Sequence, residues 1–184
     1  MTAVTAPPLD WDGYTIADLE AMPDDEFLRY ELDDGCLVVS PPPPNPHSMA
    51  STELAFVLHA ALDREYRILV EGSLLFDERN YRQPDLLVIR RAAGRRAYAA
   101  PPDVLLAVEV MSPSSKRRDR LIKPAQYAAA GIQYFWRLEP ADRVLITYVL
   151  DGESYRESGR FTDEDEVEID EPVSLRFPLT QLLD

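Results

Sequence analysis

The chain has 184 residues, of which 46% are hydrophobic and 28% charged, a composition typical of one globular domain and not of a disordered chain. Its single cysteine, Cys36, excludes an internal disulfide, no apolar run approaches the roughly 20 residues that span a bilayer, and the first residues lack the features of a signal peptide. We therefore expect a cytoplasmic protein without a membrane segment. The formal net charge of −14 argues against a nucleic-acid binder, which must place cations against phosphates.

The chain is expected to consist of an N-terminal arm and one domain. Residues 1–13 are expected to form a flexible arm, and residues 14–184 a single domain. Thr15 and Asp18 have the spacing of a helix N-terminus, and the proline after Met22 should end this short helix.

A hairpin and a long helix are predicted next. Residues 29–32 and 36–39 flank the Asp-Asp-Gly sequence at 33–35, which has the turn chemistry of a hairpin. The prolines at 41–44 cannot continue a central strand, and the Asn-Pro pair that follows predicts a capped helix over 45–66. The expected buried stripe of this helix is Leu54, Val57, Leu58, Ala61 and Leu62.

Apolar runs then predict strands at 68–70, 73–76, 85–89 and 104–111, with the loop 90–102 between the last two. The strands at 85–89 and 104–111 are almost wholly apolar, which is typical of central strands.

The following helix connects two strands that should be parallel. The serines of 112–115 offer capping oxygens for a helix that should end before Gly131, and strands are predicted near 133–138 and 143–150. Because a helical crossover suits parallel neighbours, the strand before this helix should pair with 133–138. The layout predicts an α/β fold with a mixed sheet.

Charge is distributed unevenly towards the end of the chain. Residues 151–171 contain ten acids and two arginines and carry −8, whereas the remainder carries −6. Val167, Ile169 and Val173 form short apolar-alternating pieces, so an edge meander is an alternative to a disordered tail, and 179–183 could supply one helical turn. The densest basic cluster, residues 116–120, keeps a nucleic-acid function open, because net charge does not decide what a local patch binds.

Glu109 is the one ionisable side chain in the strand at 104–111. A carboxylate inside an apolar strand costs free energy unless a cation or dense hydrogen bonding compensates it. Three explanations fit: a metal ligand, an ion pair with an arginine, or a strand end that reaches solvent. Asp85 alone is typical of a strand end, but together with Glu109 it would give the sparse oxygen set that Mg²⁺ prefers at one edge of the sheet.

Four ordered motifs add a resemblance that covers about residues 14–150. They are Tyr-Glu-Leu-Asp-Asp-Gly-Cys-Leu at 30–37, Pro-Asp-Leu-Leu-Val at 84–88, Val-Glu-Val-Met-Ser-Pro-Ser at 108–114 and Lys-Pro-Ala-Gln-Tyr-Ala-Ala-Ala-Gly at 123–131. They resemble the bacterial putative restriction endonucleases of the PD-(D/E)XK nuclease superfamily. The resemblance implies a restriction-endonuclease-like fold, that is, a mixed β-sheet flanked by α-helices.

The resemblance also implies a site. Carried over residue by residue, Asp85 and Glu109 become the metal-binding acids and Glu31 a further acid, with Mg²⁺ or Mn²⁺ as the cofactor. The superfamily lysine two residues after the second acid is replaced by Met111. Lys123 matches a lysine that has moved onto the following helix; without the resemblance it would be a solvent-exposed helix residue.

Other candidates have two explanations each. His47 matches a histidine often found in relatives, and it is also explained as a polar residue of a first helical turn. Lys116, Arg117 and Arg118 are possible phosphate contacts, although a solvent-exposed helix start explains them too. A further departure from the family is Arg137, where relatives usually have an apolar residue.

The expected function is Mg²⁺-dependent hydrolysis of DNA phosphodiester bonds. One cysteine and two histidines do not supply a zinc site, and neither a glycine-rich phosphate loop nor a G-x-S-x-G motif is present. The strongest rival is a catalytically inactive nuclease-fold module that binds nucleic acid or a protein partner. A homodimer would suit cleavage of both DNA strands.

Overall fold

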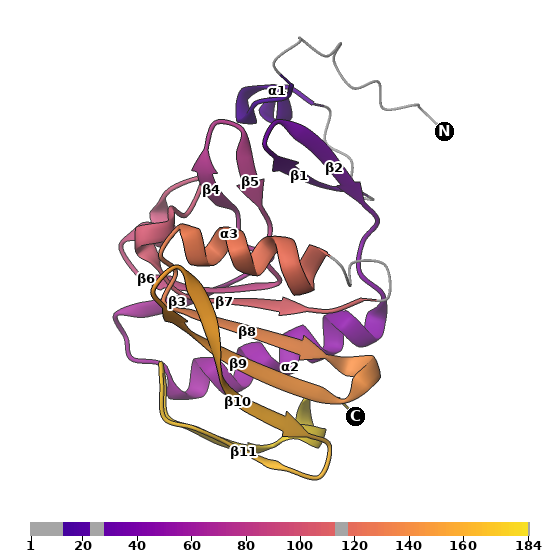
Figure 1. Cartoon of the computed structure of the whole chain (residues 1–184), viewed down its shortest axis with the longest axis vertical. Coiled ribbons are helices and arrows are strands. Elements are labelled where there is room, and N and C mark those ends of the chain that lie inside the picture. The colour runs from indigo at the N-terminus through magenta and orange to yellow at the C-terminus, as the bar shows by residue number, and fades with distance from the viewer. Residues whose placement is uncertain (1–12, 23–27, 113–117, 184) are drawn as a thin grey trace.

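The computed structural model describes residues 13–22, 28–112 and 118–183 (Figure 1). The predicted arm, except for Gly13, and residues 113–117 lie outside the described residues. Within the described parts, no helix is long and apolar enough to cross a membrane.

The main sheet is mixed, as the sequence predicts, and its described strands follow the order β10-β9-β8-β7-β6-β3. These strands are β3 (Tyr66–Val70), β6 (Leu86–Arg90), β7 (Val104–Val110), β8 (Tyr134–Glu139), β9 (Val144–Asp151) and β10 (Ser154–Thr162). β7 pairs with β8 in parallel, and the other described neighbours are antiparallel. The central strands β6 and β7 are apolar because both faces of the sheet are covered by helices.

A smaller antiparallel sheet has the order β2-β1-β5-β4. Its strands are β1 (Arg29–Asp33), β2 (Cys36–Ser40), β4 (Leu74–Asp77) and β5 (Asn80–Arg82). The predicted hairpin of β1 and β2 turns at Asp34 and Gly35, whose φ angles of 50° and 77° suit a two-residue turn. Strand β5 was not predicted, because its three residues contain no apolar run.

Helix α1 (Ile16–Glu20) begins as predicted, with a reciprocal capping box between Thr15 and Asp18. Helix α2 (Asn45–Ala61) differs from its prediction. Its N-cap is Pro44, without a side-chain hydrogen bond, and it ends at Ala61, five residues before the predicted end.

The buried side of α2 also differs from the predicted stripe. Its buried residues are His47, Ala50, Ser51, Leu54 and Leu58, whereas Val57, Ala61 and Leu62 are half-buried or exposed. The small residues of the first turns allow this end of the helix to pack against the sheet. The helix therefore brings a histidine of its first turn into the protein interior.

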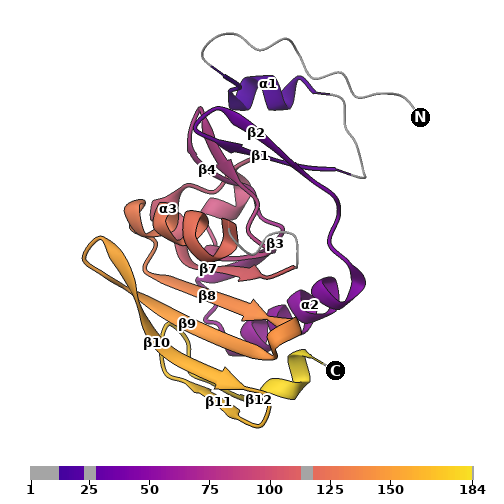
Figure 2. The same ribbon diagram turned by 45° about the vertical axis from the view of Figure 1, so that its right-hand side comes forward.

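Helices cover the two faces of the main sheet (Figures 1 and 2). On one face, α2 contributes Leu54 and Leu58 to a core that includes Trp136. On the other face, the helical segment that follows β7 continues from a π-helical turn (Arg118–Ile122) into α3 (Lys123–Ala129), and Tyr127 of α3 packs on Phe135. This segment is the predicted crossover between the parallel strands.

The acidic segment forms ordered strands and not a disordered tail: β10 is the edge strand of the main sheet, and the strands after it form a separate hairpin. After β10, strands β11 (Glu166–Ile169) and β12 (Leu175–Pro178) pair and lead into a 3-10 turn (Leu179–Leu182). Along β11 the glutamates are exposed while Val167 is fully buried against the core. The two glutamates of β11 therefore lie on the solvent face of a packed hairpin.

Candidate active site

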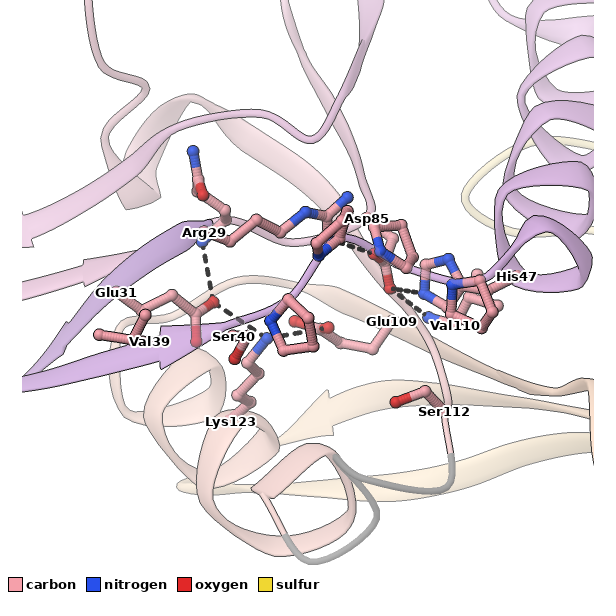
Figure 3. Close-up of a pocket in the computed structure, with 15 residues that line it drawn as sticks. Arg29, Glu31, Val39, Ser40, His47, Asp85, Glu109, Val110, Ser112 and Lys123 are labelled. Atoms are coloured by element: carbon pink, nitrogen blue, oxygen red, sulfur yellow. Dashed lines mark hydrogen bonds and ion pairs between the residues drawn. The ribbon is translucent and has the colours of Figure 1, made fainter. Parts of the chain in front are cut away.

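The four acidic and basic residues expected from the sequence lie around one pocket. β6 and β7 are antiparallel, so the start of β6, next to Asp85, lies beside the end of β7, where Glu109 is located. Glu31 comes from β1, and Lys123 from the first turn of α3. Together with His47 they line a pocket of about 350 Å³ (Figure 3).

Glu109 is 2% exposed, and both of its carboxylate oxygens have partners. Lys123 Nζ lies 3.0 Å from Oε2, and the Tyr127 hydroxyl donates to Oε1 over 2.6 Å. Of the explanations left open by the sequence, burial rules out a strand end that reaches solvent, and an ion pair with Lys123 is present. Burial raises the pKa of Tyr127 well above its ordinary value, and the charges of Glu109 and Glu31 add to the effect. Its hydroxyl stays protonated and able to donate.

Lys123 connects two carboxylates. Its Nζ lies 3.1 Å from Glu31 Oε1 as well as 3.0 Å from Glu109 Oε2, and its side chain is 8% exposed. The Glu31 oxygen also accepts the backbone N–H of Gln83 over 3.0 Å. Lys123 is therefore a buried cation at the site, not a solvent-exposed helix residue.

Asp85 is held on several sides. Its Oδ2 accepts the backbone N–H of Val110 over 2.7 Å and lies 3.1 Å from His47 Nε2, while Oδ1 is 3.4 Å from Arg29 Nη1. Burial acts to raise the pKa of Asp85, but the hydrogen bond and charge of His47, the charge of Lys123 and the Val110 N–H outweigh it, so this pKa lies below its ordinary value. Asp85 is therefore held as a carboxylate.

His47 is 7% exposed, and its position in the first turn of α2 turns it towards Asp85 instead of solvent (Figure 3). Within the described residues its Nδ1 atom has no hydrogen-bond partner. A polar residue of a first helical turn would ordinarily face water, so burial against Asp85 favours the site explanation of His47.

The predicted phosphate contacts fall on a part of the chain whose side chains the structure does not describe. Lys116 and Arg117 lie outside the described residues, and Arg118 begins the π-helical turn with a side chain that is also outside the description. The neighbouring Arg120 forms ion pairs with Glu139 and Asp142, away from the pocket.

Two basic residues near the site were missed from the sequence. Arg29 lines the pocket and also pairs with Glu71. Arg82, which is 0% exposed, donates to Leu32 O over 2.7 Å and to Gln126 Oε1 over 2.8 Å. Leu32 follows Glu31 in β1, and Gln126 is in α3 together with Lys123. Arg82 therefore connects β1 and α3, the two elements that carry Glu31 and Lys123. No local pattern marks either arginine.

The donor set suits a hard divalent cation. Among the described residues, no three His, Cys, Asp or Glu side chains already form a metal cluster. Mg²⁺, however, is commonly bound through one or two carboxylates while it keeps several waters. Asp85 and Glu109 supply two carboxylates at one pocket wall and Glu31 a third, so the oxygen chemistry fits such an ion.

Comparisons with known proteins identify the family and the fold of the chain. A family model described as putative restriction endonuclease, Uma2, matches residues 16–180. A solved structure of a putative nuclease from Anabaena variabilis, assigned to DUF820, superposes with a TM-score of 0.71 at 18% identity, over 92% of this chain and 97% of that one. This likeness confirms the predicted restriction-endonuclease-like fold. No curated protein sequence matches the chain. Because the family model spans most of its length, the chain belongs to the Uma2 family of putative restriction endonucleases.

Proposed function

We propose that the protein is an endonuclease that hydrolyses DNA phosphodiester bonds with Mg²⁺ or Mn²⁺. Asp85 and Glu109 would hold the ion, with Glu31 as a further oxygen ligand. The observation that carries the proposal is the contact of Lys123 with Glu109 and Glu31 in the pocket that Asp85 also lines. Membership of the family supports a nuclease and DNA as its substrate.

A bound divalent ion would polarise the scissile phosphate and lower the pKa of a water ligand. The protein's own residues supply orientation and charge. Lys123 carries a buried ammonium that can donate a hydrogen bond to a phosphate oxygen. Met111, at the position of the superfamily lysine, has no charge and cannot donate such a bond. His47 and the Val110 N–H both contact Asp85 Oδ2 and so fix the orientation of this carboxylate.

Cleavage of plasmid DNA tests this proposal. With Mg²⁺ or Mn²⁺ the wild type should cut the plasmid, and it should not cut in EDTA. Glu109→Gln, which keeps the size of the side chain, should lose at least about 100-fold in rate, because a metal ligand contributes no less than the outer groups that orient it. Glu168→Gln is the matched control, since Glu168 is an exposed glutamate of β11. Equal cutting by wild type and Glu109→Gln would refute the assignment.

A catalytically inactive binding module is the second candidate. Asp85, Glu109 and Glu31 each already contact a basic side chain, and Met111 leaves the usual lysine position without charge. This candidate predicts DNA or protein binding that does not depend on a divalent ion, together with no cleavage by the wild type. The plasmid assay therefore separates the two.

A further inference from the structure

Six exposed arginines gather at the end of the main sheet where β3 begins and β6 ends. This arginine cluster consists of Arg64, Arg67, Arg90, Arg91, Arg95 and Arg96. It draws on two segments, 64–67 and 90–96, that lie more than twenty residues apart in the sequence and meet because β3 pairs with β6 at the edge of the sheet (Figure 1). Six of the chain's seventeen arginines are thus concentrated in a protein of net charge −14.

The fold holds these arginines in place. The backbone N–H of Arg91 donates to Glu65 O over 2.7 Å and its Nε donates to Arg64 O over 2.5 Å. The guanidinium of Arg90 lies over the Tyr66 ring, 6.0 Å from its centroid. The 3-10 turn Ala93–Arg95 is anchored by Ala93, which is buried in the core. Because the scaffold is ordered, ligand binding would have only side-chain freedom to restrict.

The cluster has more positive charge than its own surroundings neutralise. Arg96 pairs with Asp103 over 2.6 Å. Within the described residues, none of the other five arginines forms an ion pair with a carboxylate, and the exposed acids of the same turn, Asp63 and Glu65, do not pair with them either. The guanidinium groups of Arg64, Arg67, Arg90 and Arg95 therefore have no carboxylate partner among the described residues and are available to an external anion.

We propose that the arginine cluster binds the phosphate backbone of DNA. Guanidinium groups match phosphate oxygens with paired N–H donors, and the Arg67 side chain lies beside Gly94 in the turn that carries Arg95, so these arginines suit a ligand that repeats its phosphates. The choice of DNA over another polyanion rests on the proposed function. The cluster lies outside the pocket and would add affinity that does not depend on a metal.

The position of the cluster fits a DNA strand that also reaches the pocket. Asp85 directly precedes β6, and Arg90 is the last residue of this strand. Five extended residues span roughly 17 Å, which is about five nucleotide steps of 3.4 Å along one DNA strand. A short duplex is therefore long enough to contact both.

Salt-dependent DNA binding tests the inference. The assay is fluorescence polarisation of a short labelled duplex in EDTA over a series of KCl concentrations, so that no cleavage is needed. Among the described residues, the side chains of Arg67 and Arg95 form no hydrogen bond or ion pair, so the variant Arg67→Gln/Arg95→Gln removes two positive charges without removing such a contact. Loss of two phosphate contacts should reduce the slope of log K against log salt by about 1.8 and weaken binding about 60-fold at 0.1 M salt.

The matched control is Arg156→Gln/Arg176→Gln, which removes the same charge from exposed arginines that pair with Asp151 and Glu166. This control should keep the wild-type slope. Equal slopes for both double variants, or a wild type that does not bind DNA, would overturn the inference.

Two further outcomes would assign the cluster to another partner. If Arg67→Gln/Arg95→Gln dissociates a dimer in sedimentation and leaves DNA binding unchanged, the ligand is the acidic segment of a second copy. If it abolishes binding to vesicles of anionic lipid and not to DNA, the ligand is a lipid surface. Both outcomes contradict the proposal. If the protein does not cleave DNA with Mg²⁺, only the proposed function is refuted, because DNA binding by the arginine cluster is measured in EDTA.

Discussion

Lys123→Met removes the buried cation of the pocket and keeps an unbranched side chain of similar length. The variant leaves Glu31 and Glu109 without the ammonium that lies 3.1 and 3.0 Å from them. Breaking a buried ion pair typically costs about 3–5 kcal/mol, because the remaining charge is left uncompensated. For a chain of this size we expect Tm to fall by about 6 to 20 °C in EDTA.

A divalent cation should recover part of this loss. Without Lys123, the carboxylates of Glu31, Asp85 and Glu109 face fewer positive charges, so the affinity of the pocket for Mg²⁺ should rise. A ligand at 100 times its Kd stabilises the folded state by about 2.7 kcal/mol. The measurement is the increase in Tm between EDTA and Mg²⁺, which should be larger for Lys123→Met than for wild type, while plasmid cleavage by the variant should be slower.

Arg120→Met is the control for this experiment. It also removes one positive charge, three residues earlier in the same helical segment, but from a half-exposed side chain that pairs with Glu139 and Asp142. Its response to Mg²⁺ should equal that of wild type. An equal response of Lys123→Met and Arg120→Met would refute a metal site at these carboxylates.

Three smaller predictions concern stability in EDTA, measured by urea unfolding. Tyr127→Phe should lower the free energy of unfolding by about 2 kcal/mol, because it removes a hydrogen bond to the buried Glu109 carboxylate. Tyr155→Phe removes a hydrogen bond to a neutral carbonyl and should lower it by about 1 kcal/mol. Equal losses would contradict a charged acceptor for the Tyr127 hydroxyl. Because the pKa of Asp85 lies below its ordinary 3.8, its carboxylate stabilises the fold above that pH and loses this effect as the pH falls further. The stability difference between wild type and Asp85→Asn should therefore shrink below pH 3.8, and a constant difference would contradict it. Gly35→Ala should cost about 1–2 kcal/mol, because φ at this turn is 77°; an unchanged midpoint would show that the turn tolerates a side chain.

Local patterns predicted much of the fold. The apolar runs predicted β6 and β7, and the Asp-Gly turn predicted the hairpin of β1 and β2, because these features depend on residues close in sequence. The end of α2 and the existence of β5 were not predicted. β5 is a strand because Tyr81 pairs with Leu32, forty-nine residues earlier, and no local signal records such a partner.

In the site, too, some residues were predicted from their local sequence and others were not. Glu109 stood out because a carboxylate in an apolar strand needs compensation, but its partners Lys123 and Tyr127 are on a helix that begins fourteen residues later. Lys123 was expected from the family resemblance and not from its surroundings in the sequence. The arginine cluster was not predicted, because residues 64–67 and 90–96 come together only when β3 pairs with β6. The basic residues at 116–120 were predicted as a cluster because they lie close together in the sequence.

Met111 and Lys123 together explain how the site departs from the superfamily motif. Met111 directly follows β7, and because side chains alternate along an extended chain, position 111 continues the side of the strand that carries Glu109. Met111 is 6% exposed, so a lysine at this position would be buried next to a pocket that already contains the Lys123 ammonium. Two buried ammonium groups would repel each other, and the second would lack a carboxylate of its own. An apolar residue at 111 is therefore compatible with the Lys123 ammonium that the pocket already contains.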